Sequence, residues 1–293
     1  MKKLAAALAL SLLPLAFAAQ AEITTTDVVG RKVTVPDVPK RVVLGFYYED
    51  YLAIAGPGSL DRVVGLSLTT WKDWRPKQFA AYEKALPKLK TLPDVGSTDD
   101  NTFSIEKLIA TKPDLLILAT FSYEALGESV KQIEAAGIPV LVLDYLSQTV
   151  DKHVASTLAL GKIMGQEKRA QELADNYRKA FEDIDARIKK AGPTKKKVYF
   201  ELAQKGASEV GNSYGNSMWG ALVTRLGGHN IADGQVGNWG PLSPEYVLSQ
   251  KPDLIFLAGS EWLNKPQAVQ MGFGATAAVA RERMAAYLKR PGW

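Results

Sequence analysis

Cysteine is absent from this chain of 293 residues, and histidine occurs only twice. The sequence therefore has no disulfide, no thiol nucleophile, no thiolate metal site and no cysteine to acylate as in a bacterial lipoprotein. The two histidines, His153 and His229, lie far apart in the sequence, and neither has a second histidine at the spacing of metal ligands. We therefore expect no resident cofactor and no metal site built by the protein alone.

Clusters of positive charge are also scarce. The formal net charge is +5, and it falls to +3 if Lys2 and Lys3 are removed with an N-terminal leader. No basic arm or stripe is present, so we do not expect nucleic acid as a partner. The sequence also contains no P-loop and no GxGxxG motif after a strand.

The first residues have the pattern of an export signal. Residues 1–21 combine a basic start, an apolar stretch and the small-x-small ending Ala19-Gln20-Ala21. A membrane anchor is the alternative, but the apolar run is short and contains Pro14. We expect a cleaved signal peptide and a mature protein that begins at Glu22 in the periplasm.

One stretch of sequence occurs twice. SIEKLIATKPDLLILA at 104–119 returns as SPEYVLSQKPDLIFLA at 243–258, with eight of sixteen positions identical. In each copy a short helix is predicted to end at a proline, Pro113 or Pro252. The apolar run that follows is continuous, which is typical of a parallel strand covered on both faces. The repeat predicts two related α/β lobes with a cleft between them.

The remaining pattern predicts how the lobes are organised. Strands alternate with helices, which favours Rossmann-like lobes with mostly parallel sheets. One long helix with an apolar stripe is long enough to cross from one lobe to the other. The predicted divisions are a signal peptide, an N-terminal lobe, an interlobe helix and a C-terminal lobe, at residues 1–21, 22–165, 166–192 and 193–293.

The second copy of the repeat lacks the continuation that follows the first. After Ala119 a helix and the strand VLVLDY follow, whereas after Ala258 no comparable β-branched run appears. We therefore expect a C-terminal lobe that is truncated, with a naturally short chain as the alternative.

Ligands of open α/β sheets bind beyond the carboxyl ends of the strands. Those positions are unusually aromatic here, and exposed aromatic loops favour a flat, partly apolar ligand. The alternative is that many of these rings fill the lobe cores. The candidate ligand-binding residues are Tyr47, Tyr48, Trp71, Trp74, Arg75, Phe121, Tyr123, Tyr145, Tyr214, Trp219, Trp239 and Trp262.

Two further features suggest specific chemistry. Arg75 is the one arginine among these ends and could meet an anionic group of a ligand, although a surface arginine is the ordinary alternative. Ser213 lies in a G-x-S-x-G match, the nucleophile elbow of serine hydrolases. However, the preceding strand ends some ten residues earlier, and His229 precedes Asp233, which reverses the hydrolase order. Serine esterase activity is therefore a distant alternative.

Glu106 and Glu245 occupy the same place in the two copies of the repeat. Each lies two residues after a serine that is a plausible helix N-cap, so each belongs to the first turn of equivalent helices. Helix capping alone explains one such glutamate. Two equivalent carboxylates, one on each lobe, could also be recognised by a symmetric partner with two basic sockets.

Taken together, these features resemble the periplasmic binding proteins for ferric siderophores, haem and cobalamin that serve ATP-driven importers. The resemblance rests on the GRKVTVP lead-in, the PKRVV strand, LPDVG, both S-x-E…KPD blocks and LGGHNI, and it covers nearly all of the chain after the leader. It implies that Glu106 and Glu245 dock against arginines of an inner-membrane ABC permease with its ATPase. It also implies a non-enzymatic, monomeric protein and family members that continue past the Pro-Gly-Trp element.

The resemblance identifies a family rather than a ligand. Only Arg75 represents the arginine cluster of catecholate binders, while aromatic walls favour a hydroxamate or mixed ferric siderophore. Haem, with Tyr47 as a conceivable axial ligand, cobalamin, a small oxyanion and a nickel chelate are the alternatives. We expect the cargo to be an iron chelate or a similar metal chelate.

Overall fold

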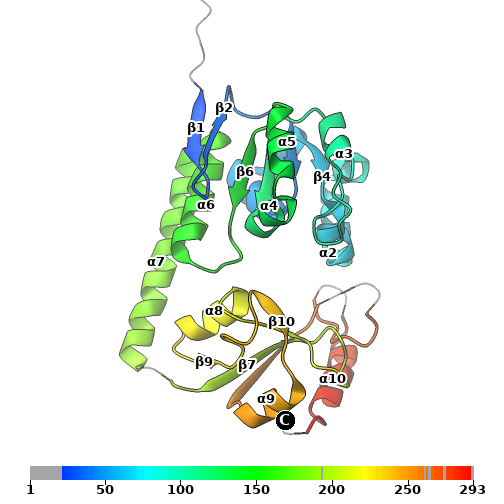
Figure 1. Ribbon diagram of the computed structural model, residues 1–293, viewed down its shortest axis with the longest axis vertical. Helices are drawn as coiled ribbons and strands as arrows, with labels where there is room; N and C mark the ends of the chain where they lie inside the picture. Colours follow the sequence, from blue (N-terminus) through cyan, green and yellow to red (C-terminus); the bar gives the residue numbers. More distant parts are fainter. Residues whose placement is uncertain (1–21, 193, 261, 263–264, 273–274, 292–293) are drawn as a thin grey trace, which may run out of the picture.

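The computed structural model describes residues 22–192, 194–260, 262, 265–272 and 275–291. Two α/β lobes lie one above the other, and the long helix α7 (Glu167–Ala191) runs along one side between them (Figure 1). The predicted fold of two lobes with mostly parallel sheets and one linking helix is confirmed. The predicted signal peptide lies outside the described residues. None of the helices in the described part is long and apolar enough to span a bilayer.

The first lobe is built on a parallel four-stranded sheet in the order β4-β3-β5-β6, preceded by the antiparallel hairpin β1-β2. The elements of this lobe, in chain order, are β1 (Ile23–Thr26), β2 (Lys32–Val35), β3 (Val42–Leu44), α1 (Tyr48–Ala55), η1 (Pro57–Arg62), β4 (Val63–Leu66), η2 (Thr69–Asp73), α2 (Pro76–Ala85), η3 (Pro87–Thr91), α3 (Ile105–Ala110), β5 (Leu115–Ala119), α4 (Thr120–Leu126), α5 (Ser129–Ala135), β6 (Val140–Leu143) and α6 (Val150–Ile163).

The second lobe is built on a parallel three-stranded sheet in the order β11-β7-β9, with a small antiparallel pair, β8 and β10. β7 occupies the centre, as β3 does between β4 and β5 in the first lobe. The elements are β7 (Lys197–Leu202), β8 (Asn212–Tyr214), α8 (Met218–Arg225), β9 (His229–Asn230), β10 (Trp239–Pro241), α9 (Pro244–Gln250), β11 (Leu254–Ala258) and α10 (Ala277–Tyr287).

The repeated sequence forms the same helix and strand in both lobes. Ser104 caps α3 by accepting a hydrogen bond from the Lys107 N–H, and Ser243 caps α9 by accepting one from the Tyr246 N–H. The strands that follow, β5 and β11, cover matching positions of the repeat. They differ in burial, because β5 lies between β3 and β6, whereas β11 pairs with β7 alone among the described strands.

Helix α7 packs its first half against α6. Ala170 and Ala174 are buried there, and a β-carbon placed on Gly161 of α6 would lie 2.1 Å from the Ala170 Cβ. Only glycine therefore allows the two helices to approach so closely. Further along α7 the apolar stripe is more open, since Ile184 is part of its exposed surface. This second half of the helix runs on toward the second lobe (Figure 1).

Candidate functional site

In the first lobe, the aromatic residues at the strand ends form one connected group of rings. Phe46 makes edge contacts with Tyr47 and Phe121, at centroid distances of 5.0 and 5.1 Å. Tyr47 in turn contacts Tyr145 at 5.0 Å. Phe46 is partly buried and lies at the centre of this group, but it is not among the candidates chosen from the sequence.

Four of the candidate residues in this group belong to the lobe core rather than to an open surface. Tyr48 and Trp71 stack in parallel at 4.6 Å, and both are buried. Tyr47 and Tyr145 are also buried, and the Tyr47 hydroxyl accepts a hydrogen bond from the Tyr145 N–H. Trp71 lies in the turn of η2 rather than in an open loop, and this turn directs its ring inward.

Burial also determines the ionisation of the tyrosines. Desolvation raises the pKa of Tyr47, Tyr48 and Tyr145 well above that of an ordinary phenol. These hydroxyls therefore remain protonated, and that of Tyr47 is already engaged within the lobe.

The structure separates Phe121 from Tyr123, although both follow the same strand. Both lie on helix α4, which begins at Thr120 directly after the strand, where the sequence predicted a helix. Phe121 packs toward the group around Phe46, whereas the Tyr123 ring lies 4.7 Å beneath the guanidinium of Arg31 from the hairpin side. Of these two residues, Phe121 thus joins the ring group and Tyr123 does not.

The second lobe presents its aromatic residues more openly. Tyr214 on β8 and Trp239 on β10 are register partners, and Trp219 on α8 stacks on Phe200 at 5.5 Å. Trp219 and Trp239 are 46% and 57% exposed, which is unusual for tryptophan in a folded lobe. Both α8 and β10 lie at the edge of the second lobe that faces the first (Figure 1).

Phe200 was missed by sequence reasoning because it lies inside a strand that reads as core. Its ring nevertheless supports both Trp219 and Tyr214, the latter at 5.9 Å. Trp262, the last aromatic candidate, is partly buried and follows β11. Trp262 is grouped with the other candidates only by its position after a strand.

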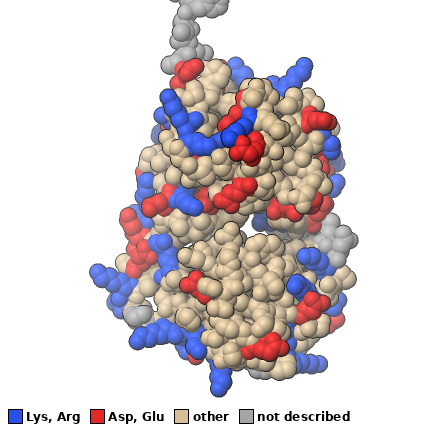
Figure 2. Space-filling model, viewed as in Figure 1, with Lys and Arg blue, Asp and Glu red and all other residues tan. Residues whose placement is uncertain are grey.

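Two carboxyl groups accompany Arg75 in the first lobe. The Arg75 guanidinium lies 3.6 Å from a carboxylate oxygen of Glu49, so its charge is offset. Next to them, desolvation, with Glu49 as a further contributor, raises the pKa of Asp50 to about 6. Figure 2 shows a groove between the lobes, with Asp and Glu side chains and some Lys or Arg along the border of the first lobe and mostly uncharged residues on that of the second.

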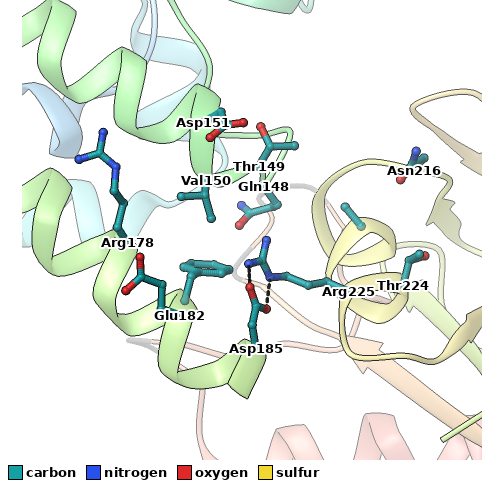
Figure 3. A pocket seen from close by; sticks show the side chains of 12 residues that line it. Gln148, Thr149, Val150, Asp151, Arg178, Glu182, Asp185, Asn216, Thr224 and Arg225 are labelled. Atoms are coloured by element: carbon teal, nitrogen blue, oxygen red, sulfur yellow. Dashed lines mark hydrogen bonds and ion pairs between the residues drawn. The ribbon is translucent and has the colours of Figure 1, made fainter. Parts of the chain in front are cut away.

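A pocket of about 630 Å³ lies at the seam between the lobes, on the α7 side. Its lining comes from three places: the loop before α6 with the first turn of that helix, residues 178–185 of α7, and α8 with Asn216 ahead of it (Figure 3). Arg225 of α8 crosses this seam to Asp185 of α7, with hydrogen bonds of 3.1 and 2.6 Å. None of the candidate residues chosen from the sequence lines this pocket.

Glu106 and Glu245 are exposed on the first turns of α3 and α9. Within the part of the chain that the structure describes, neither carboxylate forms an ion pair. Both therefore remain accessible to a partner.

Ser213 does not have the surroundings of a nucleophile. It lies on β8 rather than at a strand-to-helix turn, it is fully buried, and its hydroxyl has no hydrogen-bond partner among the described residues. His229 begins the short strand β9 and is exposed. No group of three or more His, Cys, Asp or Glu residues in the described ranges is placed to hold a metal ion.

Comparison with known proteins places these features in context. A family model described as a periplasmic binding protein matches residues 43–282. The crystal structure of a TroA-like periplasmic binding protein, FepB from Veillonella parvula, superposes with a TM-score of 0.81 at 32% identity, over 92% of this chain and 80% of that one.

Two relatives by sequence are each 26% identical. One is an ABC transporter substrate-binding lipoprotein, YvrC of Bacillus subtilis, aligned over 80% of this chain and 68% of the relative. The other is the molybdate-binding protein MolA of Haemophilus influenzae, aligned over 83% and 70%.

Proposed function

Because the chain belongs to the periplasmic binding protein family, the binding component of ABC transporters, we propose that it captures a ferric siderophore or a similar metal chelate between its lobes. The chelate would then pass to an inner-membrane permease driven by its ATPase. The main support is the pair of exposed tryptophans, Trp219 and Trp239, at the edge facing the first lobe. Exposed indole rings lose unfavourable contact with water when a flat, partly apolar ligand covers them.

The electrostatics of the cleft favour a chelate with little net negative charge. Arg75 is offset by Glu49, and Asp50 adds a further carboxyl group nearby. A ferric trihydroxamate is neutral, whereas a ferric tricatecholate and molybdate are anions that this border would repel. Hydroxamate or mixed siderophores are thus the preferred cargo within this proposal.

We also propose export to the periplasm through the leader 1–21 and function as a monomer. One relative is a lipoprotein by name, but this sequence contains no cysteine that could carry the lipid. In the same proposal, Glu106 and Glu245 orient the protein on the permease.

The test is tryptophan fluorescence of the mature protein, titrated with ferric hydroxamates, ferric catecholates, haem, cobalamin and molybdate. Saturable quenching by a ferric hydroxamate is expected, and a double W219A/W239A variant should bind it at least about tenfold more weakly, a loss of about 1.4 kcal/mol. The control is Leu248→Ala, an exposed apolar residue on α9. Absence of saturable binding to every metal chelate in the panel would contradict the proposal.

A further inference from the structure

One face of α7 is shared by both lobes. Tyr177, Phe181 and Asp185 follow one another at intervals of four residues, so they lie on the same side of the helix. His153 of the first lobe stacks on Tyr177 with ring centroids 3.6 Å apart. Arg225 of the second lobe reaches the other end of this row. Successive turns of one helix therefore connect the two lobes.

Arg225 makes two different contacts with α7. Its guanidinium donates hydrogen bonds to both carboxylate oxygens of Asp185, at 3.1 and 2.6 Å (Figure 3). It also lies 4.3 Å from the centroid of the Phe181 ring, in cation–π geometry. A two-pronged hydrogen bond combined with ring contact fixes the orientation of the guanidinium as well as its distance.

The same helix α8 carries Arg225 at its end and Trp219 in its first turn. At its start, the Met218 N–H donates a hydrogen bond of 3.2 Å to the Leu146 carbonyl of the first lobe. Met218 has a φ of 46°, a left-handed conformation that is unfavourable for methionine. Helix α8 is thus held at both ends by groups outside its own lobe.

The pocket of about 630 Å³ lies between these two contacts. Gln148 and Thr149 line it from the first lobe, and Asn216 and Thr224 line it from the second (Figure 3). Because side chains do not fill this space, packing alone does not fix the distance between the lobes on this side. The contacts of Arg225 therefore contribute much to fixing the distance between the lobes.

We propose that Arg225 is a positioning residue, which through Asp185 and Phe181 holds α8 against the linking helix and so sets the separation of the lobes. This separation also positions Trp219 for the ligand, and that part of the inference rests on the function proposed above. The structural part of the inference does not depend on any ligand.

The test measures the distance between the lobes directly. Because the chain has no cysteine, spin labels can be placed on Gln132→Cys of α5 and Ser249→Cys of α9, both exposed, without removing native thiols. Double electron–electron resonance on the ligand-free mature protein then gives the distribution of interlobe distances. R225A and D185N should both broaden and shift this distribution.

The matched control is R187A. Arg187 forms an exposed ion pair with Asp183 at 2.7 Å, and both residues of this pair belong to α7. R187A should leave the distribution unchanged. D185N preserves side-chain size at a half-exposed position, so it is expected to fold. If circular dichroism shows that R225A is unfolded, the interlobe distances of D185N alone test the proposal.

An unchanged distribution in D185N, or equal broadening in R187A, would overturn the assignment of Arg225. Failure of ligand binding in the fluorescence titration would instead contradict the proposed function and leave this result intact. The two proposals therefore fail separately.

Discussion

His153 of α6 and Tyr177 of α7 lie face to face, with ring centroids 3.6 Å apart and planes within 4°. The Tyr145 ring packs against the imidazole in an edge-to-face arrangement, with ring centroids 4.7 Å apart. Desolvation by these surroundings lowers the pKa of His153 to about 4, so the ring is neutral near pH 7. The stack thus joins the linking helix to the first lobe through an uncharged imidazole.

This stack predicts a dependence of stability on pH. In the unfolded chain His153 takes up a proton near pH 6.5, whereas in the folded protein it does so only near pH 4. The unfolded state therefore binds more protons in this window, and the free energy of unfolding should fall as pH decreases from 6.5 to 4. Denaturant titrations of the wild type and H153F should show a smaller fall in the variant.

Asp50 acts in the opposite direction over part of this range. Its raised pKa, about 6, means that the folded state takes up a proton first as pH falls, which favours folding. Comparison of H153F with the wild type removes this contribution, because Asp50 is present in both. Equal pH slopes in the two proteins would contradict the assignment to His153.

Two tryptophans that the sequence placed in one set should differ strongly in their effect on stability. Trp71 is 1% exposed and stacks on Tyr48, so W71A should lower the free energy of unfolding by about 3–5 kcal/mol. Trp239 is largely exposed, and W239A should change it by about 0.5 kcal/mol or less. Urea unfolding measures both, and similar losses would show that the burial difference is absent in solution.

The buried pair Glu201–Arg290 should be important for the second lobe. Glu201 is fully buried and accepts hydrogen bonds from the Tyr199 hydroxyl and the Gly211 N–H, while Arg290 pairs with it at 2.7 Å. Arg290→Met would leave a buried carboxylate without its cation, at a cost of about 3–5 kcal/mol.

Thermal unfolding of R290M should therefore show a markedly lower midpoint than that of R187M. Arg187→Met removes an exposed arginine of α7 and should cost no more than about 1 kcal/mol. Equal midpoints for the two variants would mean that the ion pair contributes nothing beyond a surface pair.

Docking on the permease predicts a separation between uptake and binding. A double E106K/E245K variant should lose uptake in cells that lack the wild-type protein, because both exposed carboxylates change sign. Its affinity for the chelate in the fluorescence titration should remain unchanged. E172K, which reverses an exposed charge on α7, is the control and should keep both properties. Loss of chelate affinity in the double variant would argue against a docking role.

The repeat was the most informative part of the sequence, because its helix ends and caps depend on residues close together in the chain. Pro113 and Pro252 end helices in any context, and the serines before Glu106 and Glu245 cap them as expected. The same locality predicted the strand β5 and its counterpart β11, although only β5 is covered on both faces as expected. Two-lobe architecture therefore followed from a few short-range rules.

The depth of each aromatic residue could not be predicted in this way. Trp71 and Trp74 are three residues apart, yet the turn of η2 buries the first and leaves the second exposed. Phe200 looked like core because it lies within a strand, although it supports Trp219. Long-range partners decide these outcomes, and so does the Glu49–Arg75 pair that offsets the one cleft arginine.

The repeated strands lead to different expectations for solvent access. The five residues of β5 are fully buried and hydrogen-bonded to strands on both sides, whereas Phe256 of β11 is 52% exposed and β11 pairs with β7 alone among the described strands. Backbone amides exchange with deuterium when such hydrogen bonds open, and opening requires less free energy at an edge. Two copies of one repeated sequence should therefore have different free energies of local opening, with slow exchange in LLILA and fast exchange in LIFLA.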